Sequence, residues 1–379
     1  MKLKYNFINM KKILSIVGFL IIVGLLTVTV VFYARGYRPN LNNGSVDSTG
    51  VVSVRSNPDG AKVFVNGNEK GTTDLDLSSL KPGVYLIKIV KEGFSDWEQK
   101  VEVKKEVVNV VYAVLFPKAP SLRALTFTGV VGPLFSPTTN KIVFSVSSPE
   151  DKAGIWSLDI STNTLPSFFT KDINKLLSDT PEIIFSKKTF TFSPDGKELL
   201  VHNGLDNSYY IINTSSENQT PKEVTLDVEK IQSDWNKIKT ENQARDIKKL
   251  GPEAQTLAAA LTQITLSPEK EKFFGKNKTG SFLVFDKNPG VAPNKEPRSY
   301  VLPKALHYLW YPDSDHLILV RKSSISIWAV DNQKEITVYT GVFDPEFAAV
   351  WPDGSKIVVL TSLNSAASSL PNLYAIELR

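Results

Sequence analysis

FSPDGK, at residues 192–197, is the stretch that decides how most of the chain is organised. The hydrophobic segment ELLVHN follows it at once, and a second one, YYIINT, comes after a short polar break. Proline fixes φ as one strand ends, and Asp-Gly favours a tight turn into the next strand. The stretch therefore predicts a unit made of a strand, a turn and a further strand.

Related units recur between residues 117 and 379. Each combines an aromatic or aliphatic residue, a proline, a turn and two hydrophobic strands. The other four begin at Phe135-Ser136-Pro137, Leu266-Ser267-Pro268, Trp310-Tyr311-Pro312-Asp313 and Val350-Trp351-Pro352-Asp353-Gly354-Ser355. The later units start about 40–45 residues apart, which is the size of a four-stranded propeller blade. We therefore expect a mainly β protein with a propeller of about five blades.

Two details of this propeller depend on weaker signals. Residues 121–128 (SLRALTFT) predict a strand that joins the last blade and closes the ring. Six blades are the alternative, because residues 161–190 and 286–308 could hold further strands. The FSPDGK stretch and WPDGSK at 351–356 resemble the Ser-Pro-Asp-Gly repeat of TolB-type propellers, whereas the first and third units lack Asp-Gly. Four tryptophans are expected to pack between blades and not to form a ligand cage: Trp156, Trp310, Trp328 and Trp351.

The spacing of apolar residues changes from that of strands to that of a helix at residues 226–263, within the expected propeller. Apolar residues follow one another there at roughly helical spacing among charged ones. Gly251-Pro252 ends one helix and starts the next, because proline suits a first helical turn. We expect a helical hairpin that packs against the propeller, with a partner-docking face as the alternative role.

Residues 50–116 contain several short hydrophobic segments whose spacing is not helical, and these predict β-strands. Turn signals stand at Asn66-Gly67, Pro82-Gly83 and Glu92-Gly93, and they predict five to seven strands in a small antiparallel β-sandwich. The turn Pro58-Asp59-Gly60-Ala61, with the strands around it, resembles the PEGA domain. That resemblance implies an envelope-associated module without catalytic residues. Trp97 is expected to pack in it, with glycan stacking as the alternative.

The N-terminus predicts a membrane anchor. Residues 13–33 are uncharged and mostly apolar, and an α-helix of that length spans about 30 Å, the thickness of the hydrocarbon core. Lysines in residues 1–12 favour a cytoplasmic N-terminus by the positive-inside rule. A cleaved secretory signal is the alternative, but the apolar core is longer than such signals need. Residues 34–49 are polar and predict a flexible spacer.

The net charge of +5 belongs to this anchor. Residues 1–38 hold six basic and no acidic residues, so the remainder has 38 basic and 39 acidic ones. The near-neutral body removes the bulk-charge argument for nucleic acid as a partner. The absence of cysteine excludes disulfides, thiol catalysis and Cys-based metal sites.

No motif in the sequence predicts catalysis. His202, His307 and His316 lack zinc-motif spacing and are expected at strand ends or on the surface. Asp74, Asp76 and Ser78 only partly match a calcium loop, and we interpret the two aspartates as exposed turn residues. Three further aspartates recur at equivalent turns, which indicates turn geometry: Asp195, Asp313 and Asp353. We therefore predict no catalytic, cofactor-binding or metal-binding residues and no cofactor.

These features together predict a single-pass membrane protein whose domains outside the cytoplasm bind a partner. The bilayer contacts residues 13–33, and an envelope protein or a cell-wall glycan contacts the β domains. The first alternative is a hydrolase or lyase with its site in the propeller channel. The second is an envelope sensor or assembly factor. The sequence leaves the ligand and the oligomeric state open.

Overall fold

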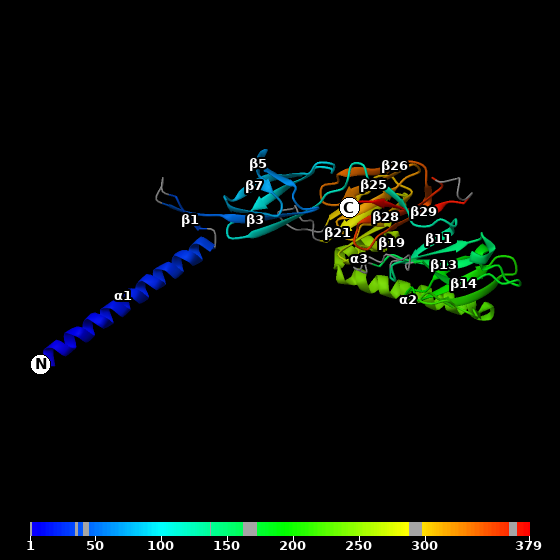
Figure 1. The fold of residues 1–379 in the computed structure, drawn as a ribbon, viewed down its shortest axis with the longest axis horizontal. Helices are drawn as coiled ribbons and strands as arrows, with labels where there is room; N and C mark the ends of the chain where they lie inside the picture. The colour runs from blue at the N-terminus through cyan, green and yellow to red at the C-terminus, as the bar shows by residue number, and fades with distance from the viewer. Residues whose placement is uncertain are drawn as a thin grey trace. The chain divides into compact units, whose positions relative to one another are not determined.

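The computed structural model describes residues 2–34, 37–40, 45–136, 138–161, 173–287, 298–363 and 370–379. The chain divides into two compact units, residues 1–115 and 116–379. In both, β-strands in separate sheets predominate, as expected (Figure 1).

The first unit begins with one long helix, α1, Lys2–Ala34. Its segment Lys12–Tyr33 has a mean hydropathy of 2.8 and none of it is buried, so it is long and apolar enough to cross a membrane. The helix also includes nearly all of the predicted cytoplasmic stretch 1–12. The expected spacer differs from the structure, because β1 (Tyr37–Asn40) pairs antiparallel with β2 (Ser45–Ser48).

A two-sheet sandwich follows, with sheet orders β6-β3-β9 and β5-β4-β7-β8. Its seven strands are β3 (Gly50–Asn57), β4 (Lys62–Val65), β5 (Asn68–Thr72), β6 (Leu75–Leu80), β7 (Gly83–Val90), β8 (Trp97–Val103) and β9 (Val108–Val114). One core of valine, isoleucine, leucine and alanine side chains lies between the sheets. The expectation of a wholly antiparallel sandwich is wrong at one pair. The last strand, β9, returns beside β3 and runs parallel to it from Val51↔Val108 to Asn57↔Val114.

The turns of this sandwich agree with the sequence. Asn66 and Gly67 have φ values of 47° and 83°, the positive values that a two-residue hairpin needs between β4 and β5. In the Pro58–Ala61 turn, Gly60 has a φ of 67° and its N–H donates to the carbonyl of Thr73. The Thr73 hydroxyl also accepts from the N–H of Ala61 at 3.0 Å. The turn is thus fixed to the chain that follows β5.

Five four-stranded antiparallel sheets make up the β structure of the second unit within the described residues (Figure 1). The first sheet is β11 (Val131–Ser136), β12 (Lys141–Val146), β13 (Gly154–Asp159) and β14 (Ile173–Ser178). The second is β15 (Thr189–Phe192), β16 (Glu198–Asn203), β17 (Ser208–Asn213) and β18 (Lys222–Glu223). The third is β19 (Thr262–Leu266), β20 (Lys272–Lys276), β21 (Phe282–Asp286) and β22 (Arg298–Val301). The fourth is β23 (His307–Trp310), β24 (His316–Val320), β25 (Ser324–Ala329) and β26 (Glu335–Thr340). The fifth is β27 (Asp344–Val350), β28 (Lys356–Thr361), β29 (Asn372–Glu377) and β10 (Leu122–Ala124).

Each repeated unit of the sequence supplies one of these sheets. The segments 161–190 and 286–308, on which the six-blade alternative depended, contain β14 and β22, and these strands complete the first and third sheets. Pro137 and residues 162–172 and 288–297 lie outside the described residues. Three short 3₁₀ turns accompany the strands: η1 (Glu150–Lys152), η2 (Phe185–Lys187) and η3 (Thr225–Asp227).

The strand predicted at 121–128 joins the last sheet, as expected. β10 pairs antiparallel with β29 from Leu122↔Ile376 to Ala124↔Tyr374. Nε of Arg123 lies 2.9 Å from a carboxylate oxygen of Glu377. The first and last strands of the second unit therefore share one sheet.

Hydrophobic cores join neighbouring sheets. One core combines β12 and β13 with β27 and β28, a second combines the first two sheets, and a third combines β20 and β21 with β23, β24 and β25. All four tryptophans named above belong to these cores or pack against them, so their predicted role between sheets is confirmed. Trp310 also donates from Nε1 to the carbonyl of Thr265 in the adjacent sheet.

The helical hairpin is present, as α2 (Val228–Lys249) and α3 (Pro252–Ala259). It ends before β19, which takes in the last two residues of the predicted insertion 226–263. Leu250 and Ala254 are buried with Phe273 and Phe285 of the third sheet. Oδ2 of Asp246 lies 2.7 Å from Nζ of Lys270, in the turn before β20. The expected packing of the insertion against the sheets is therefore observed at its C-terminal end.

Candidate functional site

A pocket of about 450 Å³ lies where the first strands of three sheets approach one another. Alternate residues of two of these strands line it, as the two-residue repeat of a strand implies: Gln263 and Thr265 of β19, and Glu346 and Ala348 of β27. The third strand, β23, contributes the consecutive residues His307, Tyr308 and Leu309.

An imidazole and a carboxylate meet in this pocket. Nε2 of His307 lies 3.3 Å from Oε2 of Glu346, and the side chains are 45% and 75% exposed. A ligand in the pocket can therefore reach both groups. A register shift in β27 between Asp344 and Ala348 brings Glu346 to this position, and such bulges redirect side chains.

An aromatic wall forms the other side of the pocket. Phe274, Phe282 and Tyr308 contact one another there, with ring centroids 4.7–6.1 Å apart. Nζ of Lys276 lies 6.0 Å from the centre of the Phe282 ring. Burial raises the pKa of Tyr308, whose hydroxyl donates to the carbonyl of Pro303 at 2.7 Å. The pocket thus offers a carboxyl group, an imidazole, an amine and an apolar surface to one ligand.

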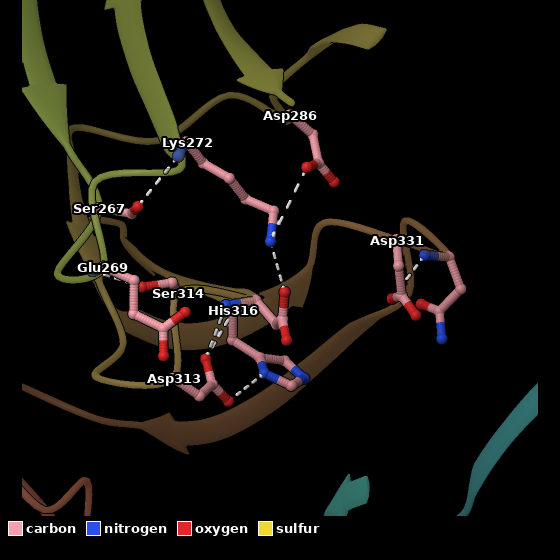
Figure 2. Close-up of polar contacts among 10 residues, drawn as sticks. Ser267, Glu269, Lys272, Asp286, Asp313, Ser314, His316 and Asp331 are labelled. Carbon is pink, nitrogen blue, oxygen red and sulfur yellow. Dashed lines mark hydrogen bonds and ion pairs between the residues drawn. The ribbon is translucent and has the colours of Figure 1, made fainter. Parts of the chain in front are cut away.

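A second cluster of charged residues lies between the turns of the third and fourth sheets, as Figure 2 shows. Nζ of Lys272 lies 2.5 Å from Oδ1 of Asp315 and 3.9 Å from Oδ1 of Asp286. Burial alone would lower the pKa of Lys272, but Asp315 and then Asp286 outweigh it and raise the pKa. The amine therefore stays protonated and holds the two sheets together.

His316 and Asp313 form the other half of this cluster (Figure 2). Nδ1 of His316 lies 2.7 Å from Oδ2 of Asp313. The other carboxylate oxygen of Asp313, Oδ1, accepts from the backbone N–H groups of Asp315 and His316. The rings of Phe116 and Tyr311 meet the imidazole edge-on, with centroids 5.2 and 6.1 Å away. Nearby, burial raises the pKa of Asp331. The pair is enclosed by protein, so we assign it to packing of the turn.

The histidines lie at or near strand ends, as predicted. His307 and His316 open β23 and β24, and His202 stacks on Tyr209 with centroids 4.4 Å apart. The sequence did not indicate that His316 is enclosed, because the rings that cover it come from residues distant in sequence or on the opposite side of the turn. The sequence did offer one signal for the pairing with Asp313, since His316 follows that residue by three positions in the turn motif.

The recurring aspartates fix turns, as predicted. Asp195 accepts from the N–H of Lys197, and Asp353 accepts from that of Ser355. Asp313 does the same and also binds His316. The hydroxyl of Tyr311 donates to the carbonyl of Gly354, in the fifth motif, at 2.7 Å. This hydrogen bond connects the fourth and fifth sheets. Burial raises the pKa of Tyr311 to about 12.

An arginine side chain binds one of the aspartates of the partial calcium motif. Oδ1 of Asp76 lies 3.0 Å from Arg55 and accepts from the hydroxyl of Ser53 at 2.7 Å. Asp76 lies within strand β6 and not in a turn, since the hydrophobic residues around it pair with β3. Trp97 packs against the sandwich core. Within the described residues, no group of three or more His, Asp or Glu side chains could hold a metal ion.

Comparison with known proteins identifies one part of the chain. Residues 49–117 match the family model of the PEGA domain, which confirms the resemblance drawn from the sequence. No curated protein matches the chain.

Two solved structures resemble it weakly. A protein provisionally assigned as TolB from Agrobacterium tumefaciens is 16% identical, with a TM-score of 0.22. The match covers 50% of this chain, and the chain spans 57% of that protein. A protein provisionally assigned as a 6-phosphogluconolactonase from Bacteroides uniformis is 11% identical, with a TM-score of 0.20, over 79% of this chain and 89% of that one.

Proposed function

We propose that the chain is a binding or scaffold protein of the bacterial cell envelope, held to the membrane by α1, with no catalytic activity. Its N-terminus is cytoplasmic and both β units lie outside the cytoplasm. The PEGA match, the exposed apolar helix and the lysines before it support this placement. The five sheets form a five-bladed propeller, supported by their four-strand order and by the β10–β29 pairing.

The pocket at the first strands of three sheets carries the binding proposal. Glu346 and His307 on one side and Lys276 beside an aromatic wall on the other suit a ligand that has both a positive and a negative group. Peptides and peptide-bearing cell-wall glycans have both. Exposed side chains of this kind recognise such groups through charge-assisted hydrogen bonds.

A binding measurement tests the proposal. The full chain in detergent is titrated with soluble peptidoglycan fragments that carry stem peptides, and heat release is recorded. We expect binding that Glu346→Gln and Lys276→Gln each weaken at least fivefold, while Glu253→Gln on the exposed face of α3 leaves it unchanged. Absence of binding, or equal binding by all variants, contradicts the proposal, and breakdown of the fragments supports the hydrolase alternative.

Topology is tested separately, using the absence of cysteine. Leu205 is 93% exposed in the second unit, so Leu205→Cys creates a single reactive thiol there. We expect a membrane-impermeant maleimide to label this variant in intact cells. Labelling only after lysis contradicts the extracytoplasmic placement.

A further inference from the structure

β9 is an edge strand of the first unit with an apolar, exposed outer face. In the sheet order β6-β3-β9, no described strand pairs with its second edge. Val108, Val110 and Tyr112 are 62%, 71% and 58% exposed. Residues 107–115 contain no charged residue. Protein monomers rarely leave such an edge open, because it is a template for pairing with another strand.

The other three edge strands of the sandwich carry charges. β5 contains Glu69 and Lys70, and β6 contains Asp76. β8 alternates Glu98, Lys100 and Glu102. Charges on an edge discourage further pairing. The sandwich is therefore protected at three edges and unprotected at β9.

The backbone of β9 is oriented for this pairing. The N–H of Val51 donates to the carbonyl of Val107, and the N–H of Leu115 donates to the carbonyl of Asn57. Between these two bonds the parallel ladder alternates, so residues 109, 111 and 113 direct their N–H and C=O groups to β3. Val108, Val110 and Tyr112 direct theirs to the open edge.

We propose that β9 pairs antiparallel with β9 of a second copy of this chain, about a two-fold axis at Val110. The same three residues then supply both the outward backbone groups and the exposed side chains. Val110 lies opposite its own copy, and Val108 lies opposite Tyr112, a β-branched and aromatic pair of the kind that stabilises sheets. The two three-stranded sheets become one sheet of six strands.

The charge pattern favours a second copy as the occupant. The edge is uncharged, so self-pairing brings no like charges together. On the neighbouring strand β3, Arg55 is the register partner of Tyr112, and Asp76 binds it at 3.0 Å. Isologous contacts of this kind need a self-complementary patch, and this residue order provides one.

Cross-linking tests both the contact and its register. The chain has no cysteine, so Val110→Cys in the full chain in detergent can form only an intermolecular disulfide. We expect this variant to form covalent dimers under mild oxidation. Val84→Cys, equally exposed at 62% but on β7 between two paired strands, is the control and stays monomeric.

A mixture of Val108→Cys and Tyr112→Cys chains should cross-link more than either alone. In the proposed register the two copies of residue 108 are about 13 Å apart, beyond the reach of a disulfide. Cross-linking of each single variant with itself would indicate a different register and overturn the proposed pairing.

Concentration dependence gives a second measurement. Sedimentation equilibrium of the full chain should show a monomer–dimer equilibrium that Val110→Lys weakens at least tenfold and Val84→Lys does not change. A monomer at all concentrations, or a dimer unaffected by Val110→Lys, overturns the proposal. Circular dichroism confirms that each variant is folded, and if Val110→Lys is not, the cross-linking result decides.

Discussion

Nδ1 of His316 lies 2.7 Å from Oδ2 of Asp313, in a turn where the two side chains are only 12% and 22% exposed. Burial alone would lower the pKa of His316, but Asp313 outweighs it and raises that pKa. Burial alone would raise the pKa of Asp313, but His316 and two backbone N–H groups lower it. Each partner thus keeps the other charged.

The pair predicts a pH window for stability. The contribution of protonated His316 is complete below its unfolded pKa of about 6.5 and is lost as pH rises through its raised folded value. The contribution of ionised Asp313 is complete above about pH 3.9 and is lost as pH falls through its lowered folded value. We expect the pair to stabilise most between about pH 4 and 6.5.

Urea unfolding followed by tryptophan fluorescence checks this window. His316→Gln should lower the free energy of unfolding at pH 6 by about 3 kcal/mol, because one member of an enclosed pair is removed. The loss of stability between pH 6.5 and 9 should be smaller in the variant than in the parent chain. Equal slopes in the two proteins would show that the pair does not contribute.

Thr126 tests the pairing of the first and last strands. Its hydroxyl donates to Oδ1 of Asn372 at 3.1 Å and accepts from the N–H of Leu373 at 2.9 Å. Thr126→Val keeps the shape but leaves both groups buried without this partner, at a cost of about 1–3 kcal/mol. Thr240→Val, on the exposed part of α2, should cost much less. The free energies of unfolding of the two variants decide, and equal values would contradict the prediction.

Gly354 tests the contact between the fourth and fifth sheets. Its φ is 72°, and a Cβ there would lie 2.3 Å from Oη of Tyr311. Gly67 also has a positive φ, 83°, but nothing lies within 4 Å of its Cβ position. Gly67→Ala should cost about 1–2 kcal/mol of backbone strain.

Gly354→Ala should cost roughly 1–3 kcal/mol more than Gly67→Ala, because the side chain of Tyr311 must move. Differential scanning calorimetry of both variants provides the comparison. If Gly354→Ala is no more harmful than Gly67→Ala, the contact between the two sheets is looser than the geometry indicates.

Asp246 tests how the helical hairpin is held. Lys270 and Lys249 bind its carboxylate, and they lower its pKa. Its ionised form therefore stabilises above about pH 3.9, and that contribution disappears as pH falls below this value. Asp246→Asn should cost about 1 kcal/mol at pH 7.

The matched control for this change is Asp234→Asn on the exposed face of α2, which should have little effect. Thermal unfolding at pH 7 and pH 3 measures both. A cost of Asp246→Asn that is the same at the two pH values would exclude an ionic role.

Local signals predicted the elements that they encode. FSPDGK and WPDGSK each stand at a turn between two strands, because proline and Asp-Gly act within four residues. Gly251-Pro252 separated α2 from α3 for the same reason. The helix α1 followed from one uninterrupted apolar run.

Features that depend on distant residues were not predictable. The parallel pairing of β9 with β3 joins strands more than 50 residues apart, and neither strand's own pattern indicates its direction. The pocket collects Gln263, His307 and Glu346 from three separate sheets. His316 is enclosed by Phe116, which the sequence places 200 residues earlier. Periodicity reports which face of a strand is buried, but not which neighbour buries it.

The shared sheet of β10 and β29 also sets the order of folding. Arg123 and Glu377 are separated by 254 residues, so this contact forms only when the C-terminal strand has been synthesised. Contacts of such large sequence separation form slowly. A chain cut short before β29 retains an open edge on β28, which makes an incomplete molecule recognisable to proteases and prone to aggregate. Completion of this sheet therefore depends on β29.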